Sequence, residues 1–201
     1  KLVTTVYAAI RSYQQISTVN QNRKGLEKII SSAGELLELH SVHDYAQGVL
    51  GQLNQFLDGV KSSVFCARGH GIIHGADDLS FYILAQEGLS SILINQKLDT
   101  LKNDQASQQV ATCFQQKSHQ YSTGNVALYI ASGGYRAVIY LELEQAIPES
   151  DRQLIEVFLA NIAIGYENVH LFQKLSNAAY KDWLTELPNR LEFVNLLDDF
   201  A

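Results

Sequence analysis

The stretch that decides the fold is NVALYIASGGYRAVIYLELE, residues 125–144. Two runs rich in apolar, β-branched and aromatic residues stand on either side of Ser132-Gly133-Gly134. A short glycine-rich turn between such runs is a strong hairpin signal, because glycine adopts the positive φ angles that tight hairpin turns require. The second run stays apolar until Glu142, so we expect it to be a central strand. Hairpin-joined strands indicate an α+β fold, an antiparallel sheet with helices packed against it.

Shorter signals of both kinds precede the hairpin. SSVFCAR (62–68) and SFYILAQ (80–86) are rich in β-branched and aromatic residues and predict strands, and SILI (91–94) is a further strand candidate. Around residues 26–37, 42–57 and 105–117 the apolar residues are spaced as in helices. Ser41, three residues before Asp44, is placed to cap the second of these helices. The expected order is helices, strands, a helix, the hairpin and a final helix.

The final helix is long and carries a heptad pattern. No proline occurs between Asp151 and Lys181, and at about 1.5 Å per residue this helix would reach roughly 45 Å. Its far end would leave a small domain or pack on a partner. The N-terminal segment has a similar stripe, for which packing on its own domain is an equally good explanation. We expect a homodimer through these terminal helices, with a seam of Leu2, Val6, Ala9, Tyr13, Ile155, Phe158, Ile162, Val169 and Phe172.

Composition bounds the class of protein. The chain has 201 residues, a formal net charge of −6 and two cysteines, Cys66 and Cys113. So few cysteines fit a reducing cytoplasm, and the acidity disfavours nucleic acid as the main partner, because phosphate binding needs clustered Lys and Arg. No apolar run approaches the roughly 18 residues of a membrane-spanning helix, and no signal peptide is visible. Methionine is absent and the chain starts at Lys1, from which we expect a piece of a longer protein.

Residues that could carry chemistry are sparse. His70 and His74 lie four apart, near Asp77 and Asp78, and these residue types can bind zinc. The stretch is too rich in glycine for the helix that such spacing suits, so we expect an exposed loop and no metal site. The two cysteines fall at apolar strand and helix positions, which are typical of small buried hydrophobes. No Ser–His–Asp or paired-carboxylate pattern is legible, and we expect no catalytic residue and no enzyme activity in this chain.

The segment DWLTELPNRLEF, residues 182–193, resembles the opening motif of GGDEF domains, which make cyclic di-GMP from two GTP molecules. Glu186 departs from the glycine usual there, and Leu191 from a second arginine. The resemblance implies that Asn189 contacts the guanine base. The GG[DE][DE]F signature is absent from the chain, so the resemblance implies the regulatory part of a longer enzyme, with or without a phosphodiesterase domain. The matching positions are Asp182, Leu184, Thr185, Leu187, Asn189 and Arg190.

A second resemblance covers most of the chain. Residues 134–175 look like the end of a GAF domain, through a helix pattern that Ile162, Ala163, Glu167, Asn168 and Leu171 fit. The likeness is to a GAF-related domain found between response-regulator receiver domains and cyclic di-GMP catalytic domains. It implies a signalling helix at 1–22 that continues a receiver domain, a GAF-like sensory domain at 23–175, and a linker end with the start of a truncated GGDEF domain at 176–201.

GAF domains bind small ligands between the sheet and a helix over it, so the resemblance also implies a pocket. The sequence identifies no cofactor and no ligand, and residues of the NKFDE type that mark cyclic-nucleotide-binding relatives are absent. Taken singly, each pocket candidate is better explained as ordinary core. The candidates are Phe65, Tyr82, Leu84, Cys113, His119 and Tyr121.

The two resemblances together predict a cytoplasmic, non-catalytic, dimeric module. It would carry a conformational signal from an upstream receiver domain, through its terminal helices, to a GGDEF output domain in the same chain. The alternative is a GAF sensor in which a small bound molecule gates the same output.

Overall fold

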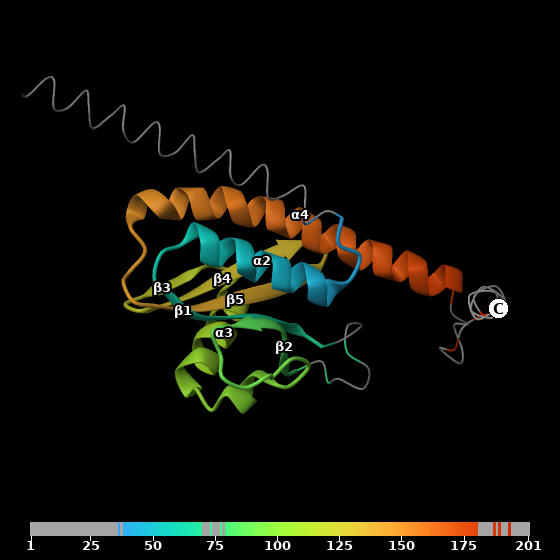
Figure 1. The fold of residues 1–201 in the computed structure, drawn as a ribbon, viewed down its shortest axis with the longest axis horizontal. Helices are drawn as coiled ribbons and strands as arrows, with labels where there is room; N and C mark the ends of the chain where they lie inside the picture. Colours follow the sequence, from blue (N-terminus) through green and yellow to red (C-terminus); the bar gives the residue numbers. More distant parts are fainter. Residues whose placement is uncertain are drawn as a thin grey trace, which may run out of the picture.

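The computed structural model describes residues 36, 38–69, 73, 77, 79–180, 187, 189 and 193. Within them, five strands form one antiparallel sheet in the order β2-β1-β5-β4-β3 (Figure 1). The predicted α+β fold is confirmed, whereas the predicted N-terminal helix lies outside the described residues. The elements in chain order are α2 (Val42–Phe56), β1 (Val60–Arg68), β2 (Phe81–Glu87), the 3₁₀ turn η1 (Leu98–Leu101), α3 (Asp104–Gln116), β3 (Gln120–Ser122), β4 (Asn125–Ser132), β5 (Tyr135–Leu143) and α4 (Glu149–Tyr180).

The hairpin forms as its sequence predicts. β4 pairs with β5 from Asn125 opposite Glu142 to Ser132 opposite Tyr135. Gly133 and Gly134 make the turn with φ angles of 55° and 92°, which residues with a side chain rarely adopt. β5 also pairs with β1, so it is central, as expected.

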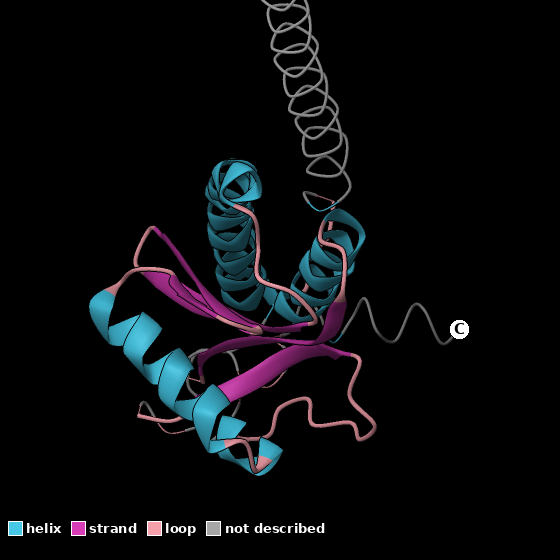
Figure 2. Cartoon of the chain, turned by 90° about the vertical axis from the view of Figure 1, so that its left-hand side faces the viewer, coloured by secondary structure: helices cyan, strands magenta, loops and turns pink. Residues whose placement is uncertain are grey.

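Helices cover both faces of the sheet (Figure 2). Along the two central strands, alternate side chains point to opposite faces. Phe65 and Ile139 lie in the core shared with α2 and α4, whereas Cys66 and Val138 lie in the core shared with α3. Burial on both faces explains why these strands read as unbroken apolar runs rather than as alternating ones.

Two of the helices begin at side-chain caps. The Ser41 hydroxyl accepts from the Asp44 amide, 3.5 Å away, as predicted. α3 starts after Asn103, whose side-chain oxygen accepts from the Ala106 amide at 3.1 Å. These contacts satisfy amides that a helix leaves without a partner in its first turn.

The strand expected at residues 91–94 does not form. This stretch is a loop in which Ile92 is 82% exposed. The residues just after it bond to β2 instead: the Asn95 amide donates to the Ile83 carbonyl, and the Ile83 amide donates to the Gln96 carbonyl. Asn95 has a φ of 64°, which turns the chain where a strand would have continued. The short strand β3 has no counterpart among the expected elements.

Across the described residues, no helix is both long enough and apolar enough to cross a membrane.

Candidate functional site

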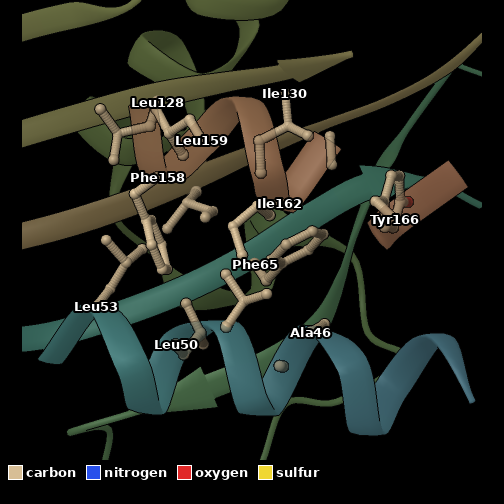
Figure 3. Close-up of a cluster of buried hydrophobic side chains, with 14 of the residues drawn as sticks. Ala46, Leu50, Leu53, Phe65, Leu128, Ile130, Phe158, Leu159, Ile162 and Tyr166 are labelled. Carbon is tan, nitrogen blue, oxygen red and sulfur yellow. The ribbon is translucent and has the colours of Figure 1, made fainter. Parts of the chain in front are cut away.

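Helix α4 packs against α2 and against strands β4 and β5. Its inner face is buried against the sheet and α2 (Figure 3). In that view Phe158, Ile162 and Tyr166 point from α4 into the same core as Leu50 of α2 and Phe65 of β1. Figure 1 shows α4 running on past the sheet toward the C-terminal end of the chain.

This packing corrects the predicted dimer seam on α4. Ile155, Phe158, Ile162 and Val169 are at most 3% exposed and belong to the core of their own chain. They are therefore not available to a partner helix. Phe172, the fifth residue of that prediction on α4, is 46% exposed. Its ring is tilted against that of His40, with the ring centroids 4.2 Å apart. The seam residues of the N-terminal segment, from Leu2 to Tyr13, lie outside the described residues.

The first polar contact of α4 is with α2. The Tyr45 hydroxyl donates to the backbone carbonyl of Ile162, 2.8 Å away, inside the core. Gly165 makes this approach possible, because a β-carbon there would stand 2.8 Å from the ring atom Cζ of Tyr45. Burial raises the pKa of the Tyr45 hydroxyl far above its ordinary value, so it stays a donor at any physiological pH.

The second contact is with the β4–β5 hairpin. The Ser132 hydroxyl donates to the Glu167 carboxylate. One turn further along α4, His170 stacks on Tyr135 with ring centroids 4.1 Å apart and planes 6° apart. Burial, and next the Lys174 ammonium, lower the pKa of His170 to about 4. The imidazole is therefore neutral near pH 7 and packs as an aromatic ring.

The third contact is with the strand β3 region. His119 accepts at Nδ1 from the Tyr129 amide, 2.9 Å away. Its proton must then sit on Nε2 in the neutral ring, from where it donates to the Glu156 carboxylate on α4 at 3.2 Å. Beside it, the Arg152 guanidinium lies over the Tyr121 ring, 4.5 Å from its centroid. Three separate parts of the domain thus hold α4 between Arg152 and His170.

The opposite face of the sheet carries a cationic and aromatic cluster. The Arg68 guanidinium lies about equally far from Phe81 and Phe114, at 5.0 and 5.1 Å from the two ring centroids. Tyr129 continues the cluster, with its ring centroid 6.2 Å from that of Phe114. On the neighbouring strand β5, Arg136 stands one residue beyond the pair of Ala67 with Ala137, as Arg68 does on β1. Sequence reasoning missed this cluster, whose members come from four different elements.

Comparison with known proteins identifies the family to which the chain belongs. Residues 6–175 match the family described as "Domain of unknown function (DUF3369)". The chain belongs to the DUF3369 family. Among curated proteins, it is 24% identical over 193 residues to "3'3'-cGAMP-specific phosphodiesterase 2" of Vibrio cholerae, and the match covers 96% of this chain and 36% of that protein. The DUF3369 chain therefore spans little more than a third of that relative.

Solved structures show that this DUF3369 member has the GAF fold. It aligns with a TM-score of 0.57 to a GAF sensor protein from Burkholderia vietnamiensis, over 76% of this chain and 93% of the other, at 9% identity. The GAF domain of a phosphoenolpyruvate-protein phosphotransferase from Acinetobacter aligns with a TM-score of 0.55, over 73% and 94%, at 10% identity. A free methionine-R-sulfoxide reductase from Neisseria meningitidis also aligns with a TM-score of 0.55, over 75% of this chain and 93% of the other, at 8% identity. At such identities the likeness concerns the fold alone.

The six predicted pocket residues of the DUF3369 chain are not brought together. Phe65 and Leu84 belong to the core under α2 and α4, and Cys113 belongs to the core under α3. His119 and Tyr121 neighbour each other at the β3 edge, with ring centroids 6.3 Å apart. No single cavity can be lined by residues that the sheet separates in this way.

Tyr82, the sixth candidate, points to a surface ion pair. Its hydroxyl donates to the Asp77 carboxylate at 3.2 Å, and that carboxylate also pairs with Lys97 at 2.8 Å. Lys97, followed by the amide of Ser80, lowers the pKa of Asp77 well below its ordinary value. Asp77 is thus engaged with its neighbours in the loop that carries the candidate zinc ligands.

His70, His74 and Asp78 of that loop lie outside the described residues. Among the residues that the structure describes, no three His, Cys, Asp or Glu side chains gather as a metal site would require.

Neither cysteine is placed for reactivity. The Cys113 thiol donates to the Ala127 carbonyl at 3.5 Å, and burial raises its pKa to about 12. Cys66 is fully buried and its pKa is raised further by the same cause. Nucleophilic and redox chemistry of cysteine needs the thiolate, which both environments disfavour.

Most of the motif that resembles a GGDEF start lies outside the described residues. Of residues 182–193, the structure describes Leu187, Asn189 and Phe193. Leu187 is 63% exposed. The Asn189 side chain donates to the Ala179 carbonyl at 2.7 Å, and its amide donates to the Tyr180 carbonyl at 2.8 Å. Asn189 therefore binds carbonyls that the last turn of α4 leaves without a helical partner.

Proposed function

We propose that this chain is a non-catalytic regulatory module that controls the output of a cyclic-dinucleotide enzyme domain following it in the same protein. A signal reaches the GAF-fold body from an upstream receiver domain and alters how α4 rests on it. The change then passes along α4 to the output domain. The module acts in the cytoplasm as a homodimer.

The observation that carries this proposal is the way α4 is held. Polar contacts from α2, from the β4–β5 hairpin and from the β3 region all converge on it through Tyr45, Ser132 and His119. A shift of any of these elements changes the position of α4. Because a packed helix moves as a unit, a small change at the sheet reaches its far end. The end of α4 is in turn bonded to Asn189, within the segment that resembles a GGDEF start.

Two observations support the choice of output. The segment 182–193 resembles the opening of a GGDEF domain, whose product is a cyclic dinucleotide. The Vibrio cholerae relative is named for hydrolysis of 3'3'-cGAMP, which is also a cyclic dinucleotide. Both point to the same chemical class, one by synthesis and the other by hydrolysis.

The proposal of no catalysis rests on this chain's residues rather than on its fold. The fold itself also occurs in an enzyme that reduces free methionine sulfoxide, and a fold does not determine activity. Here both thiols are buried and protonated, and His170 and Tyr45 are used in packing. Purified chain incubated with GTP, cyclic di-GMP or 3'3'-cGAMP should give no product by chromatography. Turnover above a buffer control would refute the proposal.

Transmission is tested by removing one contact of α4. Ser132→Ala removes the hydroxyl that bonds Glu167, and Ser122→Ala removes a hydroxyl from an exposed residue of β3. In the parent protein with its output domain, we expect the first variant to change the output rate several-fold and the second to leave it unchanged. Equal output from wild type and both variants would exclude this route, provided that melting curves show all three to be folded.

A second function, a ligand-gated sensor, is favoured by the cluster on the α3 face. The Arg68 guanidinium lies over the rings of Phe81 and Phe114, and Arg136 stands one residue beyond the last pair of β5 with β1, as Arg68 does on β1. Phe81, Phe114 and Tyr129 beside them are partly exposed. Cationic groups next to aromatic rings suit a small planar anion. In a thermal-shift screen of nucleotides and other anionic aromatics, a saturable stabiliser of wild type that fails on Arg136→Ala would support this function. The same shift in both proteins would place binding elsewhere.

A further inference from the structure

Helix α4 carries a second stripe on its outer face, distinct from the buried one. Exposed apolar side chains recur there: Val157 is 43% exposed, Ile164 57%, Leu171 45% and Leu175 71%. Two exposed asparagines, Asn161 and Asn168, stand between them. Successive positions alternate in steps of four and three, which is the spacing of a coiled-coil seam. We call these residues the outer seam: Val157, Asn161, Ile164, Asn168, Leu171, Leu175 and Ala178.

The two kinds of seam position hold different residues. The positions called d in a heptad are the apolar residues at 157, 164, 171 and 178, and the positions called a are those at 161, 168 and 175. Asparagine therefore occupies two successive a positions. A single asparagine at position a is known to fix the register and the number of strands in parallel coiled coils, at a cost in stability.

We propose that the outer seam pairs with the same seam of a second copy, as a parallel, in-register, two-stranded coiled coil in which Asn161 and Asn168 set the alignment. This rests on the proposed function, whose dimer it specifies. In a parallel pair each a position faces the same position of the partner helix. Asn161 then meets Asn161 and Asn168 meets Asn168, and an amide can both donate to and accept from another amide.

Other arrangements leave the amides without partners. In an antiparallel pair a positions face d positions, so Asn161 and Asn168 would be buried against apolar side chains. In a parallel pair shifted by one heptad, Asn161 meets Asn168, but the other asparagine meets Leu175. A buried amide without a hydrogen-bond partner is costly, so only the in-register parallel pair satisfies both layers.

The charged neighbours of the seam do not oppose this pairing. Glu167 and Lys174 precede Asn168 and Leu175 in the flanking g positions. Each is engaged with its own domain: Glu167 accepts from Ser132, and Lys174 lies 5.0 Å from the ring centroid of Tyr135. Asn161 donates to the Val157 carbonyl of its own helix at 2.9 Å, a contact that an amide of the partner can replace. The seam's polar groups are thus matched by a second copy of this chain rather than by a purely apolar partner.

Cysteine cross-linking of the 201-residue chain tests the alignment. Ile164→Cys and Leu171→Cys, made separately, each bring two thiols together in the proposed dimer, and Asn177→Cys is a control on an exposed position outside the seam. The buried native cysteines stay silent under mild oxidation. We expect both seam variants to form disulfide-linked dimers at least tenfold faster than the control. An antiparallel pair permits this at one of the two positions at most, so cross-linking at only one, or at neither, overturns the proposal.

The role of the asparagines is tested by changing both to valine. The double variant Asn161→Val with Asn168→Val should form a tighter dimer, which light scattering would show as dissociation at lower concentration. In the Ile164→Cys background, the same double variant should lose the preference for in-register cross-linking. An unchanged preference would overturn the assignment of the asparagines, and a monomer at tens of micromolar in the wild-type chain would overturn the seam. These readouts involve no output domain. The seam can therefore be confirmed even if the Ser132→Ala variant disproves transmission, and transmission can be confirmed even if the seam is disproved.

Discussion

The ring of Tyr45 lies so close to Gly165 that a β-carbon on the glycine would stand 2.8 Å from the ring's Cζ atom. The ring cannot retreat, because Tyr45 is 1% exposed and its hydroxyl is bonded to the Ile162 carbonyl. α2 and α4 therefore meet at a point where only glycine fits, and this contact positions the helix that we propose to carry the signal to the output domain.

Gly165→Ala should destabilise the chain although alanine favours helices. The added methyl overpacks the contact with Tyr45, at a cost of about 1–3 kcal/mol. Gly51, in the middle of α2, is the matched control, since a β-carbon there meets its nearest neighbour, Glu87, at an ordinary 3.5 Å. Gly51→Ala should stabilise by roughly 0.5–1 kcal/mol. Urea unfolding followed by circular dichroism measures both, and a gain in stability for both variants would show that the contact with Tyr45 yields easily.

His170 predicts a loss of stability in mild acid. Its folded pKa of about 4 lies below the ordinary 6.5, because of burial and then Lys174. The unfolded chain therefore binds the proton first as the pH falls, so the stabilisation is complete above about pH 6.5 and is lost between there and pH 4. This group alone should lower the free energy of unfolding by about 2 kcal/mol between pH 7 and pH 5. Burial raises the pKa of Tyr166, whose ring faces His170, so this hydroxyl stays protonated throughout.

The control for this prediction is His170→Phe, which keeps a ring against Tyr135 but cannot take up a proton. Its unfolding free energy should change less between pH 7 and pH 5 than that of wild type. Parallel pH profiles for the two proteins would assign the acid sensitivity to other groups.

The elements that could be predicted are those whose signal is local. The hairpin follows from two glycines between strand-forming runs, and the cap at Ser41 follows from a residue type at a fixed spacing. The contact between Tyr45 and Gly165 could not be found in this way, because it joins two helices far apart in the sequence. A glycine inside a helical pattern gives at most a hint of close packing.

The two stripes of α4 show where periodicity stops being informative. The stripe through Phe158 and Ile162 is the more apolar, and its spacing predicts a contact with a partner helix, but the chain's own core buries it. Spacing shows that a face is buried without showing what buries it. The pocket prediction was wrong for a related reason. Spacing places Cys113 on the apolar face of a helix without showing which side of the sheet that helix covers, and Phe65 and Leu84 lie on the other side.

The hairpin turn predicts a difference between its two glycines. Both have positive φ angles, 55° at Gly133 and 92° at Gly134, so alanine is strained at either. At Gly133 the new β-carbon would also collide with the Glu167 side chain on α4, whereas at Gly134 nothing lies within 4 Å. Gly133→Ala should therefore be the more destabilising, by roughly 1 kcal/mol or more. Equal melting temperatures for the two variants would mean that Glu167 moves aside without cost.

The two thiols should be silent in the folded chain and reactive in the unfolded one. Burial raises the pKa of Cys113 to about 12 and that of Cys66 further, and neither side chain is exposed. A disulfide-exchange reagent at pH 8 should therefore label native protein at a rate limited by opening of the fold, and should label both cysteines at once in denaturant. Because Cys113 is on the buried face of α3 and Cys66 lies in a central strand, Cys113 should react first if α3 opens locally. Prompt labelling of either thiol in the native chain would show that the α3 face is open to small molecules, which would favour the ligand-gated function over pure transmission.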